Sequence, residues 1–287
     1  MEKNWAIVTG ADGGMGRVIT KSLAQAGYSV IMACKEPNNT AYGIKTEIES
    51  EYKNATIEIE QINLLSLQSV RNFAERFIQK KRTLDLLMNN AGVLSTGFGI
   101  TENGFERTVS VNYIAPYLLT RLLLPAMQAG SRIINTVSCT YAIGKIESEF
   151  FEKGRNGNFF RIPIYGNTKL ALLLFTRELS SQLWSKGITV NAADPGIVNT
   201  KMITMEQWFD PLTDILFRPF IKTAEQGAAT AVHLALSDSL NLVSGCCYAN
   251  CKPKRLPDRI ARHPQQKELW NETEHRIKPF LAPIEVK

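Results

Sequence analysis

Residues 4–17 read Asn4-Trp5-Ala6-Ile7-Val8-Thr9-Gly10-Ala11-Asp12-Gly13-Gly14-Met15-Gly16-Arg17, an apolar run that leads into a cluster of glycines. The apolar positions after the cluster recur with helical spacing as far as Gly27. In a unit of strand, glycine turn and helix, missing side chains let the backbone approach a pyrophosphate at the helix N-terminus. The spacing Gly-x-x-x-Gly-x-Gly differs from the usual Gly-x-Gly-x-x-Gly, but its place between a strand and a helix predicts a dinucleotide-binding turn. We assign to this turn Thr9, Gly10, Asp12, Gly14, Met15, Gly16 and Arg17.

Strands and helices are expected to alternate along the rest of the chain. The expected strands cover about residues 4–9, 28–33, 55–62, 83–88, 132–137, 188–193 and 246–249, and the expected helices about 18–27, 41–52, 67–80, 102–128, 163–186 and 224–236. This alternation predicts an α/β fold of the Rossmann type, a doubly wound parallel sheet of about seven strands with helices on both faces. We expect one domain over residues 1–287, with a C-terminal extension from about residue 251.

The composition is that of an ordinary soluble globular protein, with 44% hydrophobic and 21% charged residues. No stretch approaches the roughly eighteen uninterrupted apolar residues of a transmembrane helix, and no signal peptide precedes the first strand. The five cysteines lack framework spacing and a fourth ligand nearby, which fits reduced thiols rather than a metal site. We therefore expect a cytoplasmic protein without a metal ion or a transmembrane segment.

The net charge of +6 permits anionic partners without naming one. Much of the basic character lies late in the chain, at Lys252, Lys254, Arg255, Arg259 and Arg262. These residues stand among prolines, without interleaved aromatic side chains, so they favour a solvated surface over a nucleic-acid site.

The end of the second expected strand decides between the two nicotinamide dinucleotides. An acidic residue there binds the 2′-hydroxyl of NAD, but this chain has Cys34-Lys35 before Glu36. Lys35 and Arg17 favour a 2′-phosphate and hence NADP(H), while Glu36 leaves NAD(H) open.

Polar and small residues follow the next two expected strands. Asn63 and Leu64 come after the third, where a polar and an aliphatic side chain can hold an adenine. Asn90, Ala91 and Gly92 come after the fourth, at the edge where ligands bind in open α/β sheets.

A candidate proton-transfer pair lies in Tyr165-Gly166-Asn167-Thr168-Lys169, where an apolar run with helical spacing begins. Positions i and i+4 share one helix face, so the phenol and the ammonium point into the same cleft. A cation beside the phenol favours phenolate and lowers its pKa from about 10. Tyr and Lys also fall four apart by chance in many helices, so the pair alone is weak evidence.

Other candidate residues have less distinctive surroundings. Asn112 lies inside an expected helix, where an Asn is ordinarily solvated or bonded to the backbone. Ser138 stands at the carboxyl end of the fifth strand, and residues 194–200 form a turn after the sixth. Residues 201–221 are apolar and broken by prolines, which predicts a lid over an apolar substrate. A cap on the core, an oligomer face or a peripheral membrane contact are the alternatives for this segment.

Taken together, these motifs resemble the short-chain dehydrogenase/reductase family over nearly the whole chain. The motifs are Thr9-Gly10-x-x-x-Gly14-x-Gly16, Asn89-Asn90-Ala91-Gly92, Asn112, Ser138, Tyr165-x-x-x-Lys169 and Pro195-Gly196-x-Val198-x-Thr200, in the family's order and rough spacing. Within the family, the chain is most similar to the retinol dehydrogenase branch, which includes the WW-domain oxidoreductases. Segments that carry this likeness are Ala33-Cys34-Lys35, residues 67–74, 118–124, 144–146 and 174–179, and Glu268-Leu269-Trp270.

The resemblance implies hydride transfer between NADP(H) and a hydrophobic alcohol, aldehyde or ketone of retinoid, steroid or lipid type. It implies that Tyr165 exchanges a proton with the substrate oxygen, that Lys169 lowers the pKa of Tyr165 and binds the nicotinamide ribose, and that Ser138 bonds the substrate oxygen. Asn112 would hold a water that connects Lys169 to solvent. The carboxamide end would be held by Pro195, Gly196, Val198 and Thr200. A homo-oligomer is common in the family, and a catalytically silent NADP(H) sensor on the same fold is the alternative function.

Overall fold

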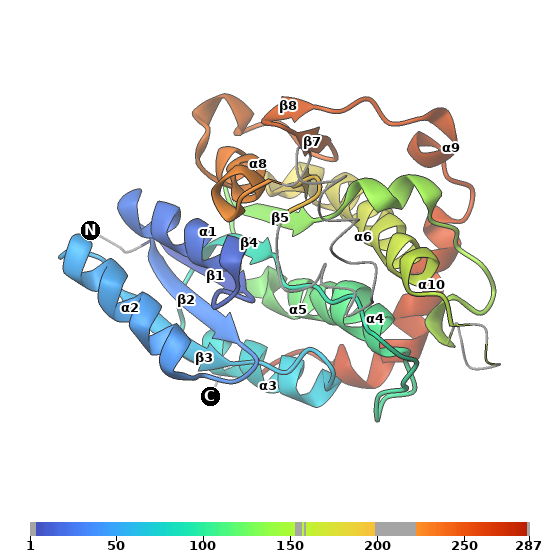
Figure 1. The fold of residues 1–287 in the computed structure, drawn as a ribbon, viewed down its shortest axis with the longest axis horizontal. Coiled ribbons are helices and arrows are strands. Elements are labelled where there is room, and N and C mark those ends of the chain that lie inside the picture. The colour runs from blue at the N-terminus through green and yellow to red at the C-terminus, as the bar shows by residue number, and fades with distance from the viewer. Residues whose placement is uncertain (1–3, 153–156, 158, 199–221, 286–287) are drawn as a thin grey trace, which may run out of the picture.

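The computed structural model describes residues 4–152, 157, 159–198 and 222–285. An eight-stranded sheet lies at its centre, in the order β3-β2-β1-β4-β5-β6-β7-β8 (Figure 1). The strands are β1 Trp5–Thr9, β2 Ser29–Cys34, β3 Ile57–Gln61, β4 Leu84–Asn89, β5 Arg132–Thr136, β6 Thr189–Asp194, β7 Cys247–Ala249 and β8 Lys252–Pro253. The first seven pair in parallel, which confirms the expected doubly wound sheet. Its order changes direction between β1 and β4, which is where ligands bind in such sheets.

The eighth strand is an addition that the sequence did not predict. β8 pairs antiparallel with β7 through a tight hairpin, in which Asn250 and Cys251 have φ angles of 52° and 58°. Two-residue hairpins favour positive φ because it matches the twist of the strands. A two-residue strand that contains a proline shows no alternation of apolar and polar residues. The sequence therefore predicted no strand after β7.

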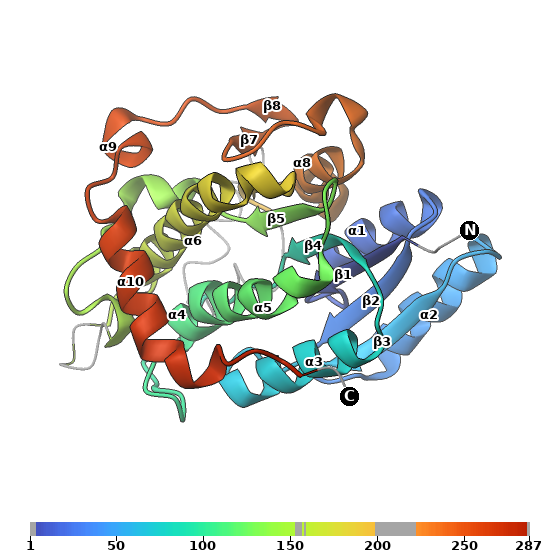
Figure 2. The ribbon, with the colours of Figure 1, turned by 180° about the vertical axis from the view of Figure 1, so that it is seen from behind.

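Helices cover both faces of the sheet (Figures 1 and 2). One face carries α1 Gly14–Gln25, α2 Asn39–Glu51 and α8 Ala224–Leu236, and the other carries α3 Leu67–Gln79, α5 Ala115–Leu123 and α6 Arg161–Leu183. Side chains of β1 alternate between the two cores, with Ile7 in one and Ala6 and Val8 in the other. Because both faces are buried, the strands read as continuous apolar runs.

The region expected as one helix over about 102–128 is divided into shorter pieces. It contains α4 Arg107–Val109, a π-helix η1 Ser110–Ile114, α5 Ala115–Leu123 and a 3-10 turn η2 Leu124–Ala126. Glu106 begins the helical part, because its buried carboxylate accepts hydrogen bonds from the backbone of Thr108 and Val109. Within η1 the Ala115 N–H reaches back five residues to the Ser110 carbonyl. Such π-turns occur most often at functional sites, and Asn112 lies in this one.

The C-terminal extension crosses the outer surface of α5 and α6 (Figure 2). It contains α9 Asp258–Ala261, α10 Gln266–Ile277 and a final turn η8 Lys278–Phe280. Trp270 of α10 stacks on Phe175 of α6 with ring centroids 5.8 Å apart and also contacts Tyr117 of α5. The Tyr113 and Thr273 hydroxyls are 2.8 Å apart in a buried hydrogen bond. The extension therefore fixes the two helical segments that carry Asn112 and Tyr165.

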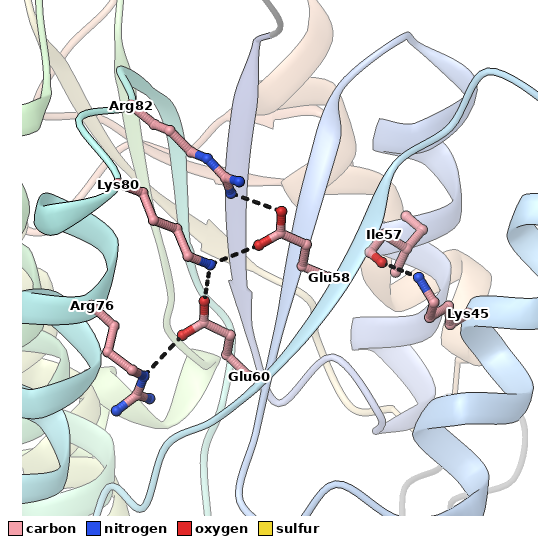
Figure 3. A network of polar contacts seen from close by, with 7 residues as sticks. All are labelled: Lys45, Ile57, Glu58, Glu60, Arg76, Lys80 and Arg82. Atoms are coloured by element: carbon pink, nitrogen blue, oxygen red, sulfur yellow. Dashed lines mark hydrogen bonds and ion pairs between the residues drawn. The ribbon is translucent and has the colours of Figure 1, made fainter.

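Two glutamates of the edge strand β3 point from one face of the sheet towards the end of α3 (Figure 3). Glu58 pairs with Lys80 and Arg82 at 2.8 Å each, and Glu60 pairs with Lys80 at 2.6 Å and Arg76 at 3.2 Å. Partly exposed pairs of this kind add little stability, but charges on an edge strand hinder its pairing with another sheet. In the part of the chain that the structure describes, no helix has both the length and the apolar character needed to cross a membrane.

Candidate active site

The glycine turn after β1 is held by close backbone contacts. Gly10 has a φ of +62°, which favours glycine, and a Cβ on Gly16 would lie 2.0 Å from the Gly10 carbonyl oxygen. Gly14 is less constrained, since a Cβ there would meet only Ala224 Cβ, at 3.6 Å. Gly16 therefore lets α1 pack onto the turn. Gly14 is the first residue of α1, and no close contact there requires a glycine.

The loops after β1 and β4 are joined at the point where the strand order changes direction. The Thr9 hydroxyl donates to the Met88 carbonyl at 3.3 Å and accepts from the backbone of Asn90 and Ala91 at 3.0 Å each. The Asn90 amide donates to the Thr9 carbonyl at 3.0 Å. Thr9 and Asn90 thus support the floor of the site.

Above this floor lies a cleft of about 420 Å³. It brings together seven residues predicted for cofactor binding, Gly10, Asp12, Lys35, Asn63, Leu64, Ala91 and Gly92. The Asn63 side-chain oxygen accepts from the Leu65 N–H at 3.1 Å, and its second lone pair is not used by that bond. The size, the glycine-lined floor and the polar edge fit the adenosine half of a dinucleotide.

The two cations predicted for a 2′-phosphate are placed differently. Lys35 lines the cleft, with its ammonium 3.6 Å from Glu36. Arg17 does not line it, because its guanidinium pairs with Glu47 of α2 at 2.5 Å. A third cation, Arg107, lines the cleft and was missed, since one arginine in a helical stretch has no distinguishing signal. Room for it comes from Gly99, where a Cβ would lie 2.5 Å from Arg107 Nε.

Tyr165 and Lys169 lie on one face of α6, as the spacing predicted, with Lys169 Nζ 5.5 Å from the Tyr165 ring centroid. The three residues between them each serve the surrounding structure. A Cβ on Gly166 would lie 2.8 Å from the Thr140 carbonyl oxygen, so glycine lets α6 touch the turn that follows β5. The Asn167 side chain accepts from the Lys145 N–H at 2.8 Å. Thr168 donates to the Tyr165 carbonyl at 2.8 Å and faces Asn112.

Ser138 meets Tyr165 at the carboxyl end of β5. It caps the 3-10 turn η3 Cys139–Ile143, and its hydroxyl lies close enough to the Tyr165 phenol to lower the pKa of that group. Burial raises the pKa of Tyr165 to about 12, the Ser138 hydroxyl offsets part of this rise, and the nearby Cys139 and Asp194 add to it. The pKa of Tyr165 is therefore raised rather than lowered, because desolvation has the largest effect and Lys169 is not among the groups that lower it.

Lys169 is fully enclosed by the ends of β5 and β6. Its ammonium donates to the Thr136 carbonyl at 2.8 Å, and its side chain is buried. Burial lowers the pKa of Lys169 to about 8, against an opposing effect of the Asp194 carboxylate. The group can therefore gain or lose a proton near neutral pH, which an exposed lysine does not do.

Both the oxygen and the nitrogen of the Asn112 side-chain amide form hydrogen bonds. Its oxygen accepts from the Val93 N–H at 2.8 Å, and its nitrogen donates to the Val93 carbonyl at 2.9 Å and to Thr168 Oγ1 at 3.1 Å. Asn112 thus ties the loop after β4 to the middle of the Tyr165–Lys169 segment. The sequence identified the residue but not these partners.

The turn after β6 is fixed by three side chains. Asp194 accepts from the Gly196 N–H at 3.0 Å, and Lys222 donates to the Pro195 carbonyl at 2.9 Å. Lys254 lies 3.0 Å from the Asp194 carboxylate, with 37% of its side chain exposed.

The last predicted cofactor contacts lie beyond this turn. Val198 and Met15 meet at Gly227, where a Cβ would be 2.5 Å from Val198 Cγ2 and 3.2 Å from Met15 Sδ. Thr200 and the expected lid at 201–221 lie outside the described residues.

Comparisons with known proteins point to one family. Residues 4–208 match a family described as short chain dehydrogenase. Retinol dehydrogenase 12 of Mus musculus is 35% identical over 267 residues, covering 92% of this chain and 83% of the relative. The crystal structure of an uncharacterized protein from Mycobacterium paratuberculosis has a TM-score of 0.77 at 25% identity, covering 99% of this chain and 96% of that chain. A blue fluorescent protein from a metagenomic library, in complex with NADPH, has a TM-score of 0.67 at 26% identity, covering 86% of this chain and 96% of its own.

Gly16→Ala is expected to lower the free energy of unfolding by about 1–3 kcal/mol, because the new methyl meets the Gly10 carbonyl and the turn must shift. Gly14→Ala is the matched control, and it is expected to change stability by less than about 1 kcal/mol. Denaturant unfolding without cofactor measures both. Equal losses in the two variants would contradict the assignment of the close contact to Gly16.

Lys169→Met is expected to stabilise the protein at neutral pH by about 2 kcal/mol, because it removes a buried amine whose charged form is disfavoured, less the hydrogen bond to Thr136. Between pH 8 and 10.5 the unfolded chain holds more protons on Lys169 than the folded chain, so wild-type stability rises with pH across this window. The advantage of the variant should shrink across the same window. Unfolding curves at several pH values test this, and a constant difference would show that Lys169 is not desolvated.

Proposed function

Because the chain belongs to the short-chain dehydrogenase/reductase family, we propose that it transfers a hydride between NADP(H) and a hydrophobic alcohol, aldehyde or ketone. The observation that carries the proposal is the convergence of Tyr165, Ser138 and Lys169 at the ends of β5 and β6, in a helix segment that Asn112 joins to Val93 of the cleft. When bound, the nicotinamide donates or accepts the hydride. The protein supplies the binding, the orientation and the proton.

Tyr165 is the proton donor for carbonyl reduction and the acceptor for alcohol oxidation. The neighbouring Ser138 hydroxyl stabilises the phenolate as it forms and binds the substrate oxygen at the same point. Lys169, with a pKa near 8, holds a proton behind Tyr165 that can exchange at neutral pH. Asn112 keeps this helix segment in register with the loop after β4 through Thr168 and Val93.

The cleft supports a dinucleotide, and its cations support NADP(H). Lys35 and Arg107 line it together with Asp12, while Glu36 brings negative charge close to Lys35. The NADPH complex of a relative in fold at 26% identity is consistent with this preference. NAD(H) remains the second cofactor of the proposal because Glu36 is adjacent.

The substrate class rests on the relatives and on composition. Retinol dehydrogenase 12, at 35% identity, has a hydrophobic alcohol in its name, and residues 201–221 of this chain are strongly apolar. We include in the proposal a cytoplasmic homo-oligomer, which size-exclusion chromatography with light scattering and cell fractionation test directly.

Turnover tests the proposal as a whole. Purified protein is mixed with NADPH or NADH and a panel of hydrophobic aldehydes and ketones, and loss of the reduced cofactor is followed. We expect turnover with NADPH, and a loss of at least about 10³-fold in kcat for Tyr165→Phe with cofactor binding retained. Binding of NADPH without turnover on a broad panel supports a catalytically silent sensor instead.

Lys35→Ala is expected to weaken NADPH binding by about 10-fold or more and to leave NADH binding unchanged, because a charge-assisted bond to the 2′-phosphate is lost. Arg17→Ala is the matched control, since Arg17 pairs with Glu47 outside the cleft and is expected to change neither affinity by more than about 2-fold. Fluorescence titration measures both affinities. A larger loss in Arg17→Ala than in Lys35→Ala would reverse the assignment.

A further inference from the structure

Asp194 is a buried carboxylate behind the reacting side chains. It is the last residue of β6, and only 3% of its side chain is exposed. The strand register places it close to Lys169, because Thr136, whose carbonyl binds Lys169, pairs with Ala193 directly before Asp194. A buried carboxylate at this position requires a partner, since an unpaired buried charge is strongly disfavoured.

The partner comes from the C-terminal extension. Lys254 directly follows β8, and its ammonium lies 3.0 Å from Asp194 Oδ2 and 5.0 Å from the Tyr141 ring centroid. The Lys254 N–H donates to the Cys247 carbonyl at 2.8 Å, so the β7–β8 hairpin fixes its backbone. Burial lowers the pKa of Lys254, but the nearby Asp194 carboxylate and Tyr141 phenol raise it by more, so Lys254 stays protonated throughout the physiological range.

We infer that Lys254 is a positioning residue of the active site, which balances the charge of Asp194 so that Tyr165 can give up its proton and the Pro195–Gly196 turn stays in place. This inference rests on the proposed function. Asp194 disfavours the phenolate of Tyr165 and favours the protonated form of Lys169, and a cation at Lys254 offsets both effects. The ionisable groups around the pair are Tyr141 on η3, Cys247 on β7, and Tyr165 and Lys169 on α6.

Removing the charge of Lys254 and removing that of Asp194 should shift the pH dependence of alcohol oxidation in opposite directions. In alcohol oxidation the rate rises with pH as Tyr165 loses its proton. Lys254→Met leaves Asp194 uncompensated, so this rise should move to higher pH, by about half a pH unit or more. Asp194→Asn leaves Lys254 uncompensated, so the rise should move to lower pH by a similar amount. The double variant Asp194→Asn/Lys254→Met should return close to wild type, and Lys254→Arg should keep the wild-type profile.

The experiment measures kcat/KM against pH for the full chain with NADP⁺ and an alcohol that it oxidises, in wild type and the four variants. Thermal unfolding of each variant reports on folding alone. A residue with a merely structural role lowers stability in both single variants without moving the two profiles in opposite directions. Coincident profiles, or shifts in the same direction, overturn the inference.

A second readout separates this inference from the proposed function. The ultraviolet absorbance of tyrosinate, taken as the difference between each variant and the same variant carrying Tyr165→Phe, follows the ionisation of Tyr165 without turnover. If wild type turns over no alcohol or carbonyl but Asp194→Asn still lowers the titration of Tyr165 relative to the double variant, the proposed function fails and the charge coupling stands. If wild type turns over substrate and the titrations coincide, only the coupling fails.

Discussion

The buried ammonium of Lys169 is the constraint on which the site depends. An amine enclosed by protein loses its hydration, and only well-placed acceptors make its charged form tolerable. The Thr136 carbonyl supplies one acceptor at 2.8 Å. The negative charge of Asp194, at the end of the neighbouring strand, also favours the protonated amine. Because β5 and β6 are parallel, their carboxyl ends meet at the same edge of the sheet. The topology therefore lets this lysine be buried while its pKa stays near neutral pH.

The helix that carries Lys169 is positioned by packing on all sides. α6 is apolar around most of its circumference, which is typical of a helix enclosed by other elements. Gly144 and Gly166 let it approach the turn after β5, since a Cβ on Gly144 would lie 2.4 Å from the Gly166 carbonyl oxygen. On its other side Phe175 stacks against Trp270 of α10. Close contacts on both sides fix the axial position of Tyr165 relative to Ser138.

Local patterns were enough to predict the parallel sheet, the glycine turn and the shared helix face of Tyr165 and Lys169, because these depend on spacing along the chain. The π-helix at Asn112 was not predictable, because its five-residue reach arises from packing rather than propensity. The partners of Arg17 and Lys254 lie 30 and 60 residues away in sequence, so their spacing carried no signal. The raised pKa of Tyr165 was missed for a related reason, since burial is a property of the whole fold.

The pKa shifts of Tyr165 and Lys169 both favour the neutral forms. The charge of Asp194 acts on both groups. A carboxylate at Asp194 opposes loss of a proton from either group, so it works with burial at Tyr165 and against burial at Lys169. Without a counter-ion, Asp194 would retain protons on both and remove the reactivity of Lys169 near pH 8. Lys254, directly after the two-residue strand β8 at the edge of the sheet, balances this charge. The C-terminal extension is therefore part of the chemistry of the site as well as of the packing of α6.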